Sequence, residues 1–331
     1  MNLLIFEYIT GGGLVGEALP ASLVSEGELM LNAVANDFTE LPDMHLYVLR
    51  DYRLTRNQHS EDSCIVSVEH SFSEVIETIS DQIDAMLIIA PESANILFDL
   101  CETYSNREFI LLNSSLDSIQ LTSNKLSTYV FLQKHNIAQI PTYEMVDVNY
   151  IDADKLIVKP MDGVGCENIV LIDMSLSENK SLNQLEIKNN IVQPYLVGQS
   201  ASLSLLCWQG VCKLLSVNIQ SIQEKNNSLE LEQCIVNAIE QERFNEFANS
   251  LVKALPGLSG YIGVDILITD NEVLLVEINP RLTTSYAGLK AALGINPAEL
   301  ILRTFTNQKL PEFTALRNTS VVVEVGAEHA A

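Results

Sequence analysis

Residues 263–281 read Gly263-Val264-Asp265-Ile266-Leu267-Ile268-Thr269-Asp270-Asn271-Glu272-Val273-Leu274-Leu275-Val276-Glu277-Ile278-Asn279-Pro280-Arg281. Two apolar runs rich in β-branched residues flank a polar turn, a pattern that predicts a β-hairpin. If residues 270–272 form a three-residue loop, one face of the hairpin is wholly aliphatic and enters the core. The opposed pairs on that face are then Val264 with Ile278, Ile266 with Val276, and Ile268 with Leu274.

The other face of this hairpin predicts a metal site. Asp265 lies opposite Glu277, and Asn279 follows two residues later on the same face, because side chains alternate along a strand. Two directly opposed carboxylates repel one another unless a cation lies between them. Oxygen ligands without His or Cys suit Mg²⁺, with Mn²⁺ as an acceptable substitute. Arg281 adds a permanent cation that can hold a phosphate or a carboxylate.

A hairpin with one solvated face is the alternative interpretation of these residues. A two-residue loop would favour it, because the register would shift by one residue and place Glu277 opposite Val264. The Asn279-Pro280-Arg281 sequence favours the metal site, since it adds a neutral ligand and a cation beside the two carboxylates.

The 331-residue chain is 47% hydrophobic and carries a formal net charge of −24. This length allows two or three domains with sizeable cores. The negative charge argues against nucleic acid or an anionic membrane as a partner. An anionic substrate therefore needs local cations, and the chain has only 19 Lys and Arg to supply them.

The six cysteines show neither a Cys-x-x-Cys pair nor the spacing of a zinc site, and the five histidines are equally dispersed. This pattern predicts reduced thiols in a cytoplasmic protein. Residues 1–6 are apolar, but no basic residue precedes them and Glu7 interrupts them, so a first strand is predicted rather than a signal peptide. No run approaches the ~20 apolar residues of a membrane span.

The first 115 residues alternate between short apolar strands and helical stretches, which predicts an α/β domain with an open parallel sheet. Strands are predicted at 3–6, 46–49, 65–68, 85–89 and 109–112, and helices at 22–38, 73–79 and 93–104. The remainder changes to a more antiparallel α+β pattern. Strands are predicted at 155–159, 169–172, 191–193, 202–207 and 211–219, and helices at 123–135, 235–255, 287–293 and 297–304.

Residues 11–16, Gly-Gly-Gly-Leu-Val-Gly, fit the Gly-x-Gly-x-x-Gly pattern of dinucleotide-binding proteins. Pro20 interrupts the helix that this pattern requires, and the acidic Asp51 lies beyond the ~20-residue spacing expected for ribose recognition. A nicotinamide-dependent dehydrogenase is therefore the weaker alternative. We favour a flexible loop that shapes a substrate pocket at the end of a strand, with Gly12 and Gly13 as candidate substrate contacts.

Two lysines stand where they could bind phosphate. Lys159 ends a predicted strand and precedes a loop that contains Gly163 and Gly165, whose backbone amides can approach phosphate oxygens. Lys125 lies at the start of a predicted helix, where its charge is unfavourable to the helix dipole. Ordinary strand-end and surface lysines are the alternatives. Further on, residues 193–198 follow a strand and are typical of a hinge whose backbone could recognise adenine.

In chain order, Lys125, Lys159, the segment at Gln193, Asp265 and the motif from Glu277 to Arg281 resemble the ATP-grasp superfamily of carboxylate–amine ligases. The resemblance covers essentially the whole chain. It implies an ATP-grasp fold with an N-terminal open parallel-sheet domain. Residues 1–115 would form the pre-ATP-grasp domain, 116–196 the small lobe, and 197–331 the large lobe with the catalytic metal site.

The resemblance also implies roles for single residues. Lys125 and Lys159 would contact the ATP phosphates beneath the loop of Gly163 and Gly165, with Lys159 and Arg281 as the catalytic residues. Gln193 and Tyr195 would contact the adenine, while Asp265, Glu277 and Asn279 would hold Mg²⁺. Many members carry an acidic ribose-binding residue just after the hinge glycine, where this chain has Gln199 as its substitute.

Residues 6–13, Phe-Glu-Tyr-Ile-Thr-Gly-Gly-Gly, followed by Ser25-Glu26-Gly27, are similar to the tyramine–glutamate ligases of methanofuran biosynthesis. This likeness implies an ATP- and Mg²⁺-dependent amide bond between glutamate and a tyramine-like or tyrosine-like amine, formed through an acyl phosphate. The partners would be these small carboxylate and amine substrates. A homodimer is the assembly expected by prior frequency alone.

Three further residues are candidates for substrate binding. Glu92 follows the fourth strand, at an edge where such sheets bind ligands, so it could meet a substrate ammonium. A carboxylate that favours a helix N-terminus is the alternative. Ser285 and Tyr286 follow Arg281 and could line the acceptor pocket, with helix capping as the alternative for Ser285. A nucleotide-binding regulatory module without turnover remains the competing function for the whole chain.

Overall fold

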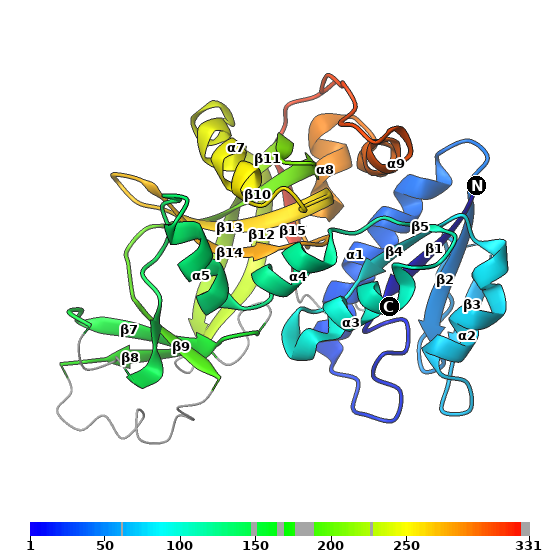
Figure 1. Ribbon diagram of the computed structural model, residues 1–331, viewed down its shortest axis with the longest axis horizontal. Coiled ribbons are helices and arrows are strands. Elements are labelled where there is room, and N and C mark those ends of the chain that lie inside the picture. The colour runs from blue at the N-terminus through cyan, green and yellow to red at the C-terminus, as the bar shows by residue number, and fades with distance from the viewer. Residues whose placement is uncertain (61, 147–150, 164–168, 176–188, 226–227, 326–331) are drawn as a thin grey trace.

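The structure is a computed structural model that describes residues 1–331 apart from 61, 147–150, 164–168, 176–188, 226–227 and 326–331. The described strands form sheets of five, four and six strands. In Figure 1 the five-stranded sheet lies at one end of the molecule and the four-stranded sheet at the other, with the six-stranded sheet between them.

The five-stranded sheet is parallel, with the order β3-β2-β1-β4-β5, and confirms the predicted open parallel sheet. Its central strands β1 and β4 are buried along almost their whole length, because helices cover both faces. The strands are β1 (Asn2–Glu7), β2 (His45–Asp51), β3 (Asp62–Val66), β4 (Ala85–Ile89) and β5 (Ile110–Leu111).

The flanking helices divide between the two faces. Helix α1 packs on the face that presents Leu3 and Ile5, whereas α2 and α3 pack on the face that presents Leu4 and Phe6. The helices are α1 (Ala21–Thr39), α2 (Phe72–Ile79) and α3 (Ile96–Tyr104). The predicted helix at 93–104 begins later than expected, because Ala94 and Asn95 have left-handed φ angles of 52° and 60° that no α-helix accommodates.

The four-stranded sheet follows two short helices, α4 (Leu116–Thr122) and α5 (Lys125–Gln133). Its strand order is β6-β9-β7-β8, and every pair is antiparallel. Its small core includes Leu156, Val158, Ile172 and Val192. The strands are β6 (Tyr143–Glu144), β7 (Lys155–Pro160), β8 (Val170–Asp173) and β9 (Asn190–Pro194).

The six-stranded sheet is antiparallel, with the order β14-β13-β10-β11-β12-β15. One face packs against α7, and the other packs against α8, α9 and α1. The strands are β10 (Gln199–Trp208), β11 (Val211–Lys225), β12 (Ser228–Ile239), β13 (Gly260–Ile268), β14 (Val273–Asn279) and β15 (Val321–Glu324). The helices are α7 (Asn245–Ala254), α8 (Tyr286–Leu293) and α9 (Pro297–Asn307).

The helix predicted at 235–255 is wrong over its first ten residues: residues 235–239 belong to β12, and α7 begins only at Asn245, after a 3₁₀ turn at Glu242–Phe244. Ile235 and Val236 pair there with Val322 and Val321 of β15. Their β-branched side chains suit a strand, and the buried Val236 adds to the core between this sheet and α8. The pairing partner lies more than 80 residues away, so local sequence could not reveal it.

Helix α1 of the N-terminal domain also packs against α8, which covers one face of the large sheet. The Tyr286 hydroxyl of α8 donates a hydrogen bond of 3.0 Å to the buried Asp37 carboxylate of α1. Lys290, one turn further along α8, lies 3.1 Å from the same carboxylate. Burial nevertheless raises the pKa of Asp37 above its ordinary value, against the effect of Lys290. A buried carboxylate with two dedicated partners orients these two helices relative to one another.

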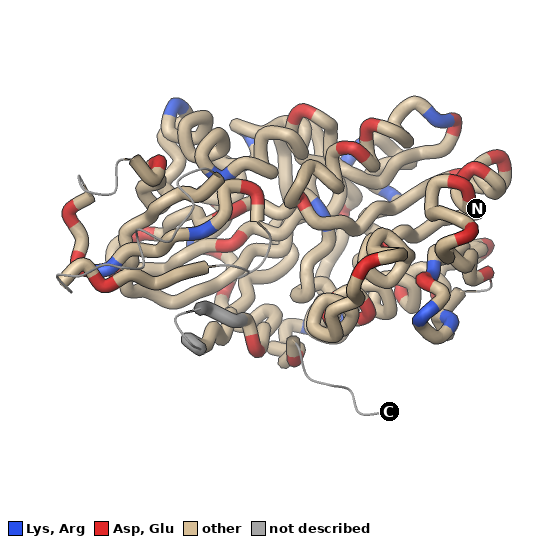
Figure 2. The backbone as a smooth tube through the Cα atoms, turned by 90° about the horizontal axis from the view of Figure 1, so that it is seen from below, with Lys and Arg blue, Asp and Glu red and all other residues tan. Residues whose placement is uncertain are grey.

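Acidic positions occur over the whole length of the molecule and outnumber basic ones (Figure 2). Among the described helices, none is both long and apolar enough to cross a bilayer.

The glycine loop after β1 is explained by close packing. A Cβ at Gly12 would lie 2.5 Å from Cγ1 of Val66, and Gly12 has a φ of 93°. A Cβ at Gly13 would lie 2.4 Å from the Tyr8 ring. Beneath the loop, the buried Glu7 carboxylate accepts hydrogen bonds from the backbone amide and hydroxyl of Thr10. This part of the resemblance motif therefore has a structural role.

Replacing Gly12 with alanine should destabilise the protein more than the same change at Gly16. Both residues have a φ near 90°, but a Cβ at Gly16 would meet nothing within 4 Å. We expect Gly16→Ala to cost about 1 kcal/mol from backbone strain, and Gly12→Ala about 1–3 kcal/mol more from overpacking against Val66. Urea unfolding of both variants measures the difference. Equal losses would show that the contact with Val66 relaxes freely.

Candidate active site

The hairpin of β13 and β14 brings Asp265 directly opposite Glu277, as predicted. Val264 pairs with Ile278 and Gly263 with Asn279, so this half of the register is confirmed. The half next to the turn is different. Ile266 pairs with Leu275 and Ile268 with Val273, so the predicted pairs of Ile266 with Val276 and Ile268 with Leu274 are wrong.

The cause is a two-residue loop followed by a bulge. The Thr269 amide donates to the Glu272 carbonyl across Asp270 and Asn271, so the loop has two residues instead of the predicted three. That register alone would place Glu277 opposite Val264. The register shifts between Asp265 and Ile266, however, and leaves Val276 as the extra residue of a β-bulge, which restores the opposition of the carboxylates.

Contacts on the outer edge of β14 accompany the bulge. The Leu275 amide donates to the Ala138 carbonyl, and the Ile140 amide donates to the Leu275 carbonyl. Leu275 then joins the core of the large sheet, while Val276 packs on the other face with Ile140. The bulge therefore places Leu275 and Val276 on opposite sides of β14.

Asp265 is held by two amide donors. Gln220 Nε2 lies 2.8 Å from its Oδ1, and Asn279 Nδ2 lies 3.0 Å from its Oδ2. Burial, with the opposed Glu277 as the next cause, raises the pKa of Asp265 to about 6. The two amides act in the opposite direction but are outweighed. Asp265 and Glu277 therefore repel one another in a buried site, and a cation bound between them would relieve this repulsion.

Glu277 has three cations around it. Its Oε2 lies 3.3 Å from Lys125 Nζ. Burial favours its neutral form, but Lys125, Lys159 and Arg281 outweigh burial and hold the pKa of Glu277 below its usual value. These three residues come from α5, from β7 and from the segment after β14. Lys125, Lys159 and Arg281 are thus close together in the structure, although they lie up to about 150 positions apart in the sequence.

The two lysines differ in their surroundings. Asn124 caps the start of α5, where its side chain accepts from the Ser127 amide. This places Lys125 so that its ammonium donates to the Gly163 carbonyl as well as contacting Glu277. Lys159 is buried near the end of β7. Gly165, the second predicted loop glycine, lies outside the described residues.

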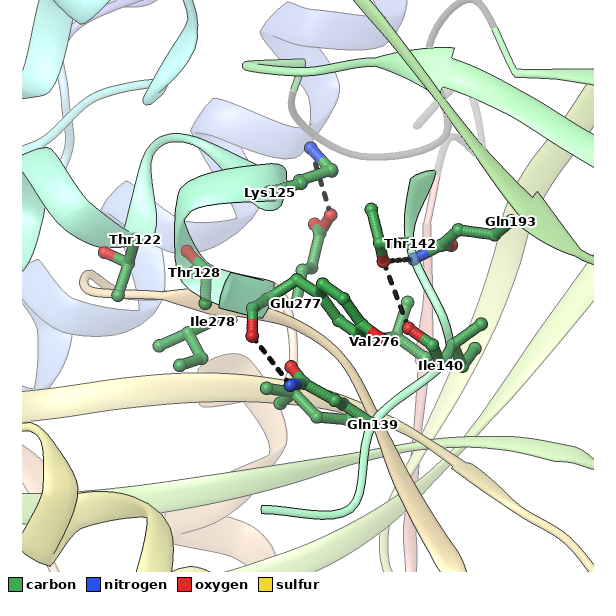
Figure 3. Close-up of a pocket in the computed structure, with 12 residues that line it drawn as sticks. Thr122, Lys125, Thr128, Gln139, Ile140, Thr142, Gln193, Val276, Glu277 and Ile278 are labelled. Atoms are coloured by element: carbon green, nitrogen blue, oxygen red, sulfur yellow. Dashed lines mark hydrogen bonds and ion pairs between the residues drawn. The ribbon is translucent and has the colours of Figure 1, made fainter. Parts of the chain in front are cut away.

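A pocket lies beside Lys125 and Glu277, between α5, β14 and β9 (Figure 3). Gln193 lines it and donates a hydrogen bond of 2.8 Å to Thr142. The pocket residues are Thr122, Lys125, Thr128, Tyr129, Gln139, Ile140, Thr142, Gln193, Leu275, Val276, Glu277 and Ile278. Sequence reasoning found Lys125, Gln193 and Glu277. It placed Leu275, Val276 and Ile278 in the hairpin without assigning them to a pocket, and it missed the other residues from 122–142, which belong to no motif.

Two predicted nucleotide contacts lie elsewhere. Tyr195 is 41% exposed, and its backbone amide donates to the Lys155 carbonyl, where β9 ends beside the start of β7. Gln199 is exposed at the start of β10, where it pairs with Ile268. Neither lines the pocket around Gln193.

Arg281 makes an ion pair with Glu92 of the N-terminal domain. Glu92 Oε2 accepts from Nε at 3.1 Å and from Nη2 at 3.0 Å. Burial opposes the charge of Arg281, but Glu92, Glu277 and Glu26 outweigh it and raise the pKa of the guanidinium. The Glu92 carboxylate caps no helix. Its Oε1 is buried and has no hydrogen-bond partner among the described residues.

Ser285 and Tyr286 do not face the pocket. The Ser285 hydroxyl belongs to a buried cluster, 2.9 Å from the Tyr261 hydroxyl and 3.0 Å from the Thr283 hydroxyl. It makes no capping hydrogen bond at the start of α8. Tyr286 is 1% exposed and directs its hydroxyl at Asp37.

Asp51, the acidic residue that the dinucleotide interpretation would need for ribose recognition, is not available for that role. Asp51 is fully buried and accepts from Nε and Nη2 of Arg53 at 2.9 and 2.7 Å. Arg53 in turn donates to the carbonyls of Leu14 and Glu17 in the glycine loop. Asp51 therefore stabilises this loop through Arg53. Its carboxylate is not exposed, so it cannot bind a ribose.

Comparisons with known proteins agree with this geometry. Residues 122–285 match the model of an ATP-grasp domain, and residues 44–119 match that of a pre-ATP-grasp domain. The chain is 28% identical over 314 residues to tyramine–L-glutamate ligase of Methanocaldococcus fervens. The alignment covers 93% of this chain and 95% of that protein. It is 27% identical over 221 residues to tetrahydromethanopterin:alpha-L-glutamate ligase of Methanocaldococcus jannaschii, with 62% and 72% covered.

Solved structures show the same fold. A putative ATP-grasp superfamily protein from Archaeoglobus fulgidus superposes with a TM-score of 0.70 at 24% identity, and covers 98% of this chain and 99% of that one. Biotin carboxylase from Campylobacter jejuni gives a TM-score of 0.71 at 14% identity, with 94% and 72% covered. The chain belongs to the ATP-grasp family, with a pre-ATP-grasp domain at its N-terminal side, and is a ligase of the acid–amine class.

Proposed function

We propose that this ligase uses Mg²⁺ and ATP to join glutamate to an aromatic amine such as tyramine, through an acyl phosphate. The observation that carries the proposal is the convergence of Lys125, Lys159 and Arg281 on the opposed carboxylates Asp265 and Glu277. The tyramine–L-glutamate ligases among its relatives support the two substrates. Residues 1–115, 116–196 and 197–331 are proposed as its three structural units.

The oxygen donors at the hairpin fit a divalent cation. Asp265 and Glu277 would supply two carboxylates, and their mutual repulsion in a buried site is relieved when a cation binds between them. Asn279 donates its amide nitrogen to Asp265, which turns its carbonyl oxygen away from that carboxylate and makes it the third proposed ligand. When bound, Mg²⁺ neutralises charge on the phosphate oxygens.

The chain's own residues would position the nucleotide. Lys125 and Lys159 are the proposed phosphate contacts, together with the backbone at Gly163. Gln193 is the proposed adenine contact, since it lines the pocket that continues from Lys125. The cavity there measures about 20 Å³, which is room for about one water. We infer that the small sheet and α5 separate from β14 when the nucleotide enters.

Arg281 and Glu92 would hold the substrate. The guanidinium can bind a carboxylate or the transferred phosphoryl group with two donors. Glu92 has one oxygen on Arg281 and a second oxygen that no described residue hydrogen-bonds, which suits an ammonium. We propose that this oxygen receives the ammonium of a substrate. The attacking amine must be neutral, and we assign no protein base to its proton.

The first prediction concerns turnover. Purified protein with ATP, Mg²⁺, glutamate and a panel of amines should release ADP only when both the acid and a suitable amine are present. Glu277→Gln should lower kcat by about 100-fold or more, because it removes a metal ligand and a charge that orients the lysines. Glu272→Gln, in the exposed turn of the same hairpin, is the matched control and should retain activity. Nucleotide binding without amine-dependent ADP release would contradict the ligase proposal.

Stability should depend on pH through Asp265. Its raised pKa means that the folded state binds a proton more tightly than the unfolded chain, so the free energy of unfolding falls as pH rises from about 4 to about 6. Glu277 has a lowered pKa, so its contribution has the opposite sign; it is gained as pH rises through the ordinary value of 4.5 and is nearly complete above about pH 5.5, which makes the fall due to Asp265 clearest above that pH. Asp265→Asn should therefore stabilise the metal-free protein at neutral pH by roughly 2 kcal/mol while it abolishes turnover.

Urea unfolding at pH 5 and pH 7.5, without divalent cations, measures this effect. The exposed turn residue Asp270 provides the control, and Asp270→Asn should leave the unfolding free energy almost unchanged at both pH values. If Asp265→Asn proves no more stable than the wild type at pH 7.5, the two carboxylates do not strain the folded state.

The role of Glu92 is tested by Glu92→Gln. Glutamine keeps a hydrogen-bond acceptor for Arg281 but loses the charge that an ammonium needs. We expect KM to rise by about 10-fold or more for the substrate that carries the ammonium, with KM for ATP nearly unchanged. Glu102→Gln, on the exposed face of α3, is the control. Unchanged KM values for both the acid and the amine would exclude Glu92 from the substrate site.

A further inference from the structure

The hairpin that joins β10 to β11 holds two cysteines in register. Its loop is Gln209-Gly210, with left-handed φ angles of 47° and 81°, the geometry of a type I′ turn. Trp208 pairs with Val211 beside the turn, and Cys207 pairs with Cys212 one step further. The two thiols therefore belong to directly opposed residues of an antiparallel pair.

The position of this pair in the ladder favours contact between the sulfur atoms. In a two-residue hairpin the residues that flank the loop form the hydrogen-bonded pair, so the next pair, Cys207 with Cys212, is non-hydrogen-bonded. Such pairs have Cα atoms about 4.5 Å apart, within the ~4.4–6.8 Å range of disulfides. Both side chains lie on the face that packs against α7.

The two thiols have different surroundings. Cys207 is fully buried. Cys212 is partly buried and lines a surface groove of about 420 Å³ with Lys213, Gln241 and Asn245. A hydrogen bond from the Cys207 thiol lowers the pKa of Cys212, whereas burial raises the pKa of Cys234 to about 12. Cys212 is thus accessible and disposed to react as a thiolate, with a second thiol beside it.

A neighbouring side chain can accommodate that thiolate. Cys212 Sγ lies 3.6 Å from the Asn249 side-chain oxygen of α7. The oxygen and nitrogen of an Asn amide exchange places by a simple rotation, so Asn249 can accept from the thiol or donate to the thiolate.

We propose that Cys207 and Cys212 are a thiol–disulfide redox pair that low-molecular-weight disulfides oxidise through this groove. The Cys212 thiolate attacks one sulfur of the small disulfide, forms a mixed disulfide and releases the first small thiolate. Cys207 loses its proton and attacks the Cys212 sulfur, which forms the protein disulfide and releases the second. Two protein thiols are thereby oxidised, and one small disulfide is reduced to two thiols.

This pair stands apart from the proposed catalytic centre. Cys207 lies near the end of β10, where it pairs with Gly260, whereas Ser202 near the other end of the strand pairs with Asp265. Oxidation should therefore cross-link the two strands of the hairpin and leave the proposed metal-binding residues in place. The proposal does not depend on which substrates the ligase uses.

Reduced full-length protein treated with oxidised glutathione provides the test. We expect Cys207 and Cys212 to become resistant to alkylation and the intact mass to fall by two hydrogen atoms. Chymotryptic cleavage after Trp208 should leave the two halves of the hairpin joined until a reductant is added. Alkylation of both thiols after oxidation, or a stable glutathione adduct on Cys212 in the wild type, would overturn the proposal. This readout needs no variant.

Substitutions then separate the roles of the two residues. Cys207→Ala should stop at the glutathione adduct on Cys212 and form it about threefold more slowly, because the hydrogen bond that favours the thiolate is lost. Cys207→Ser keeps a donor and should retain the wild-type rate of adduct formation. Cys212→Ser should leave Cys207 reduced, and Cys234→Ser, in a different core, should still form the disulfide. A disulfide that forms equally well without Cys212 would refute its role as the attacking thiol.

Discussion

The structure depends on one electrostatic constraint, the direct opposition of Asp265 and Glu277 on neighbouring strands. In a buried setting two such charges are tolerated only when other charges and donors surround them. Glu277 is satisfied by cations, whereas Asp265 is satisfied by the amides of Gln220 and Asn279. This division explains why burial and repulsion raise the pKa of one carboxylate while the pKa of the other is lowered.

Those surrounding groups come from every part of the chain. Lys125 comes from the start of α5, Lys159 from β7, and Gln220 from β11. Arg281 connects the centre to the N-terminal domain through Glu92, and α1 is fastened to α8 through Asp37. The overall charge of −24 repels anionic ligands, so this cluster of three cations is where such a ligand can overcome the field of the whole molecule. The same residues thus serve the site and the packing of its domains.

The sequence predicted the parallel sheet because the alternation of strands and helices is a local pattern. It also predicted the opposition of the carboxylates, but from a three-residue loop that the structure does not have. It failed where distant contacts decide. The true loop has two residues, and the sequence alone would then have favoured a solvated hairpin. Only the bulge at Val276, on an edge that pairs with residues 138–140, restores the opposition. Most of the other pocket residues, and the ion pair of Glu92 with Arg281, were not predicted because their partners are distant in the sequence; Glu92 and Arg281 lie 189 positions apart.

The small pocket is lined by the paired charges of Lys125 and Glu277. Lys125 contacts both Glu277 and the Gly163 carbonyl, so one ammonium joins the large sheet to the loop after β7. In the proposed reaction the lysines would turn to phosphate oxygens, and a divalent cation would take their place beside the carboxylates. Charge balance is then kept through an exchange of partners, without leaving Glu277 unpaired in a buried site. The contact of Lys125 with Glu277 is therefore the one that we propose an ATP phosphate replaces.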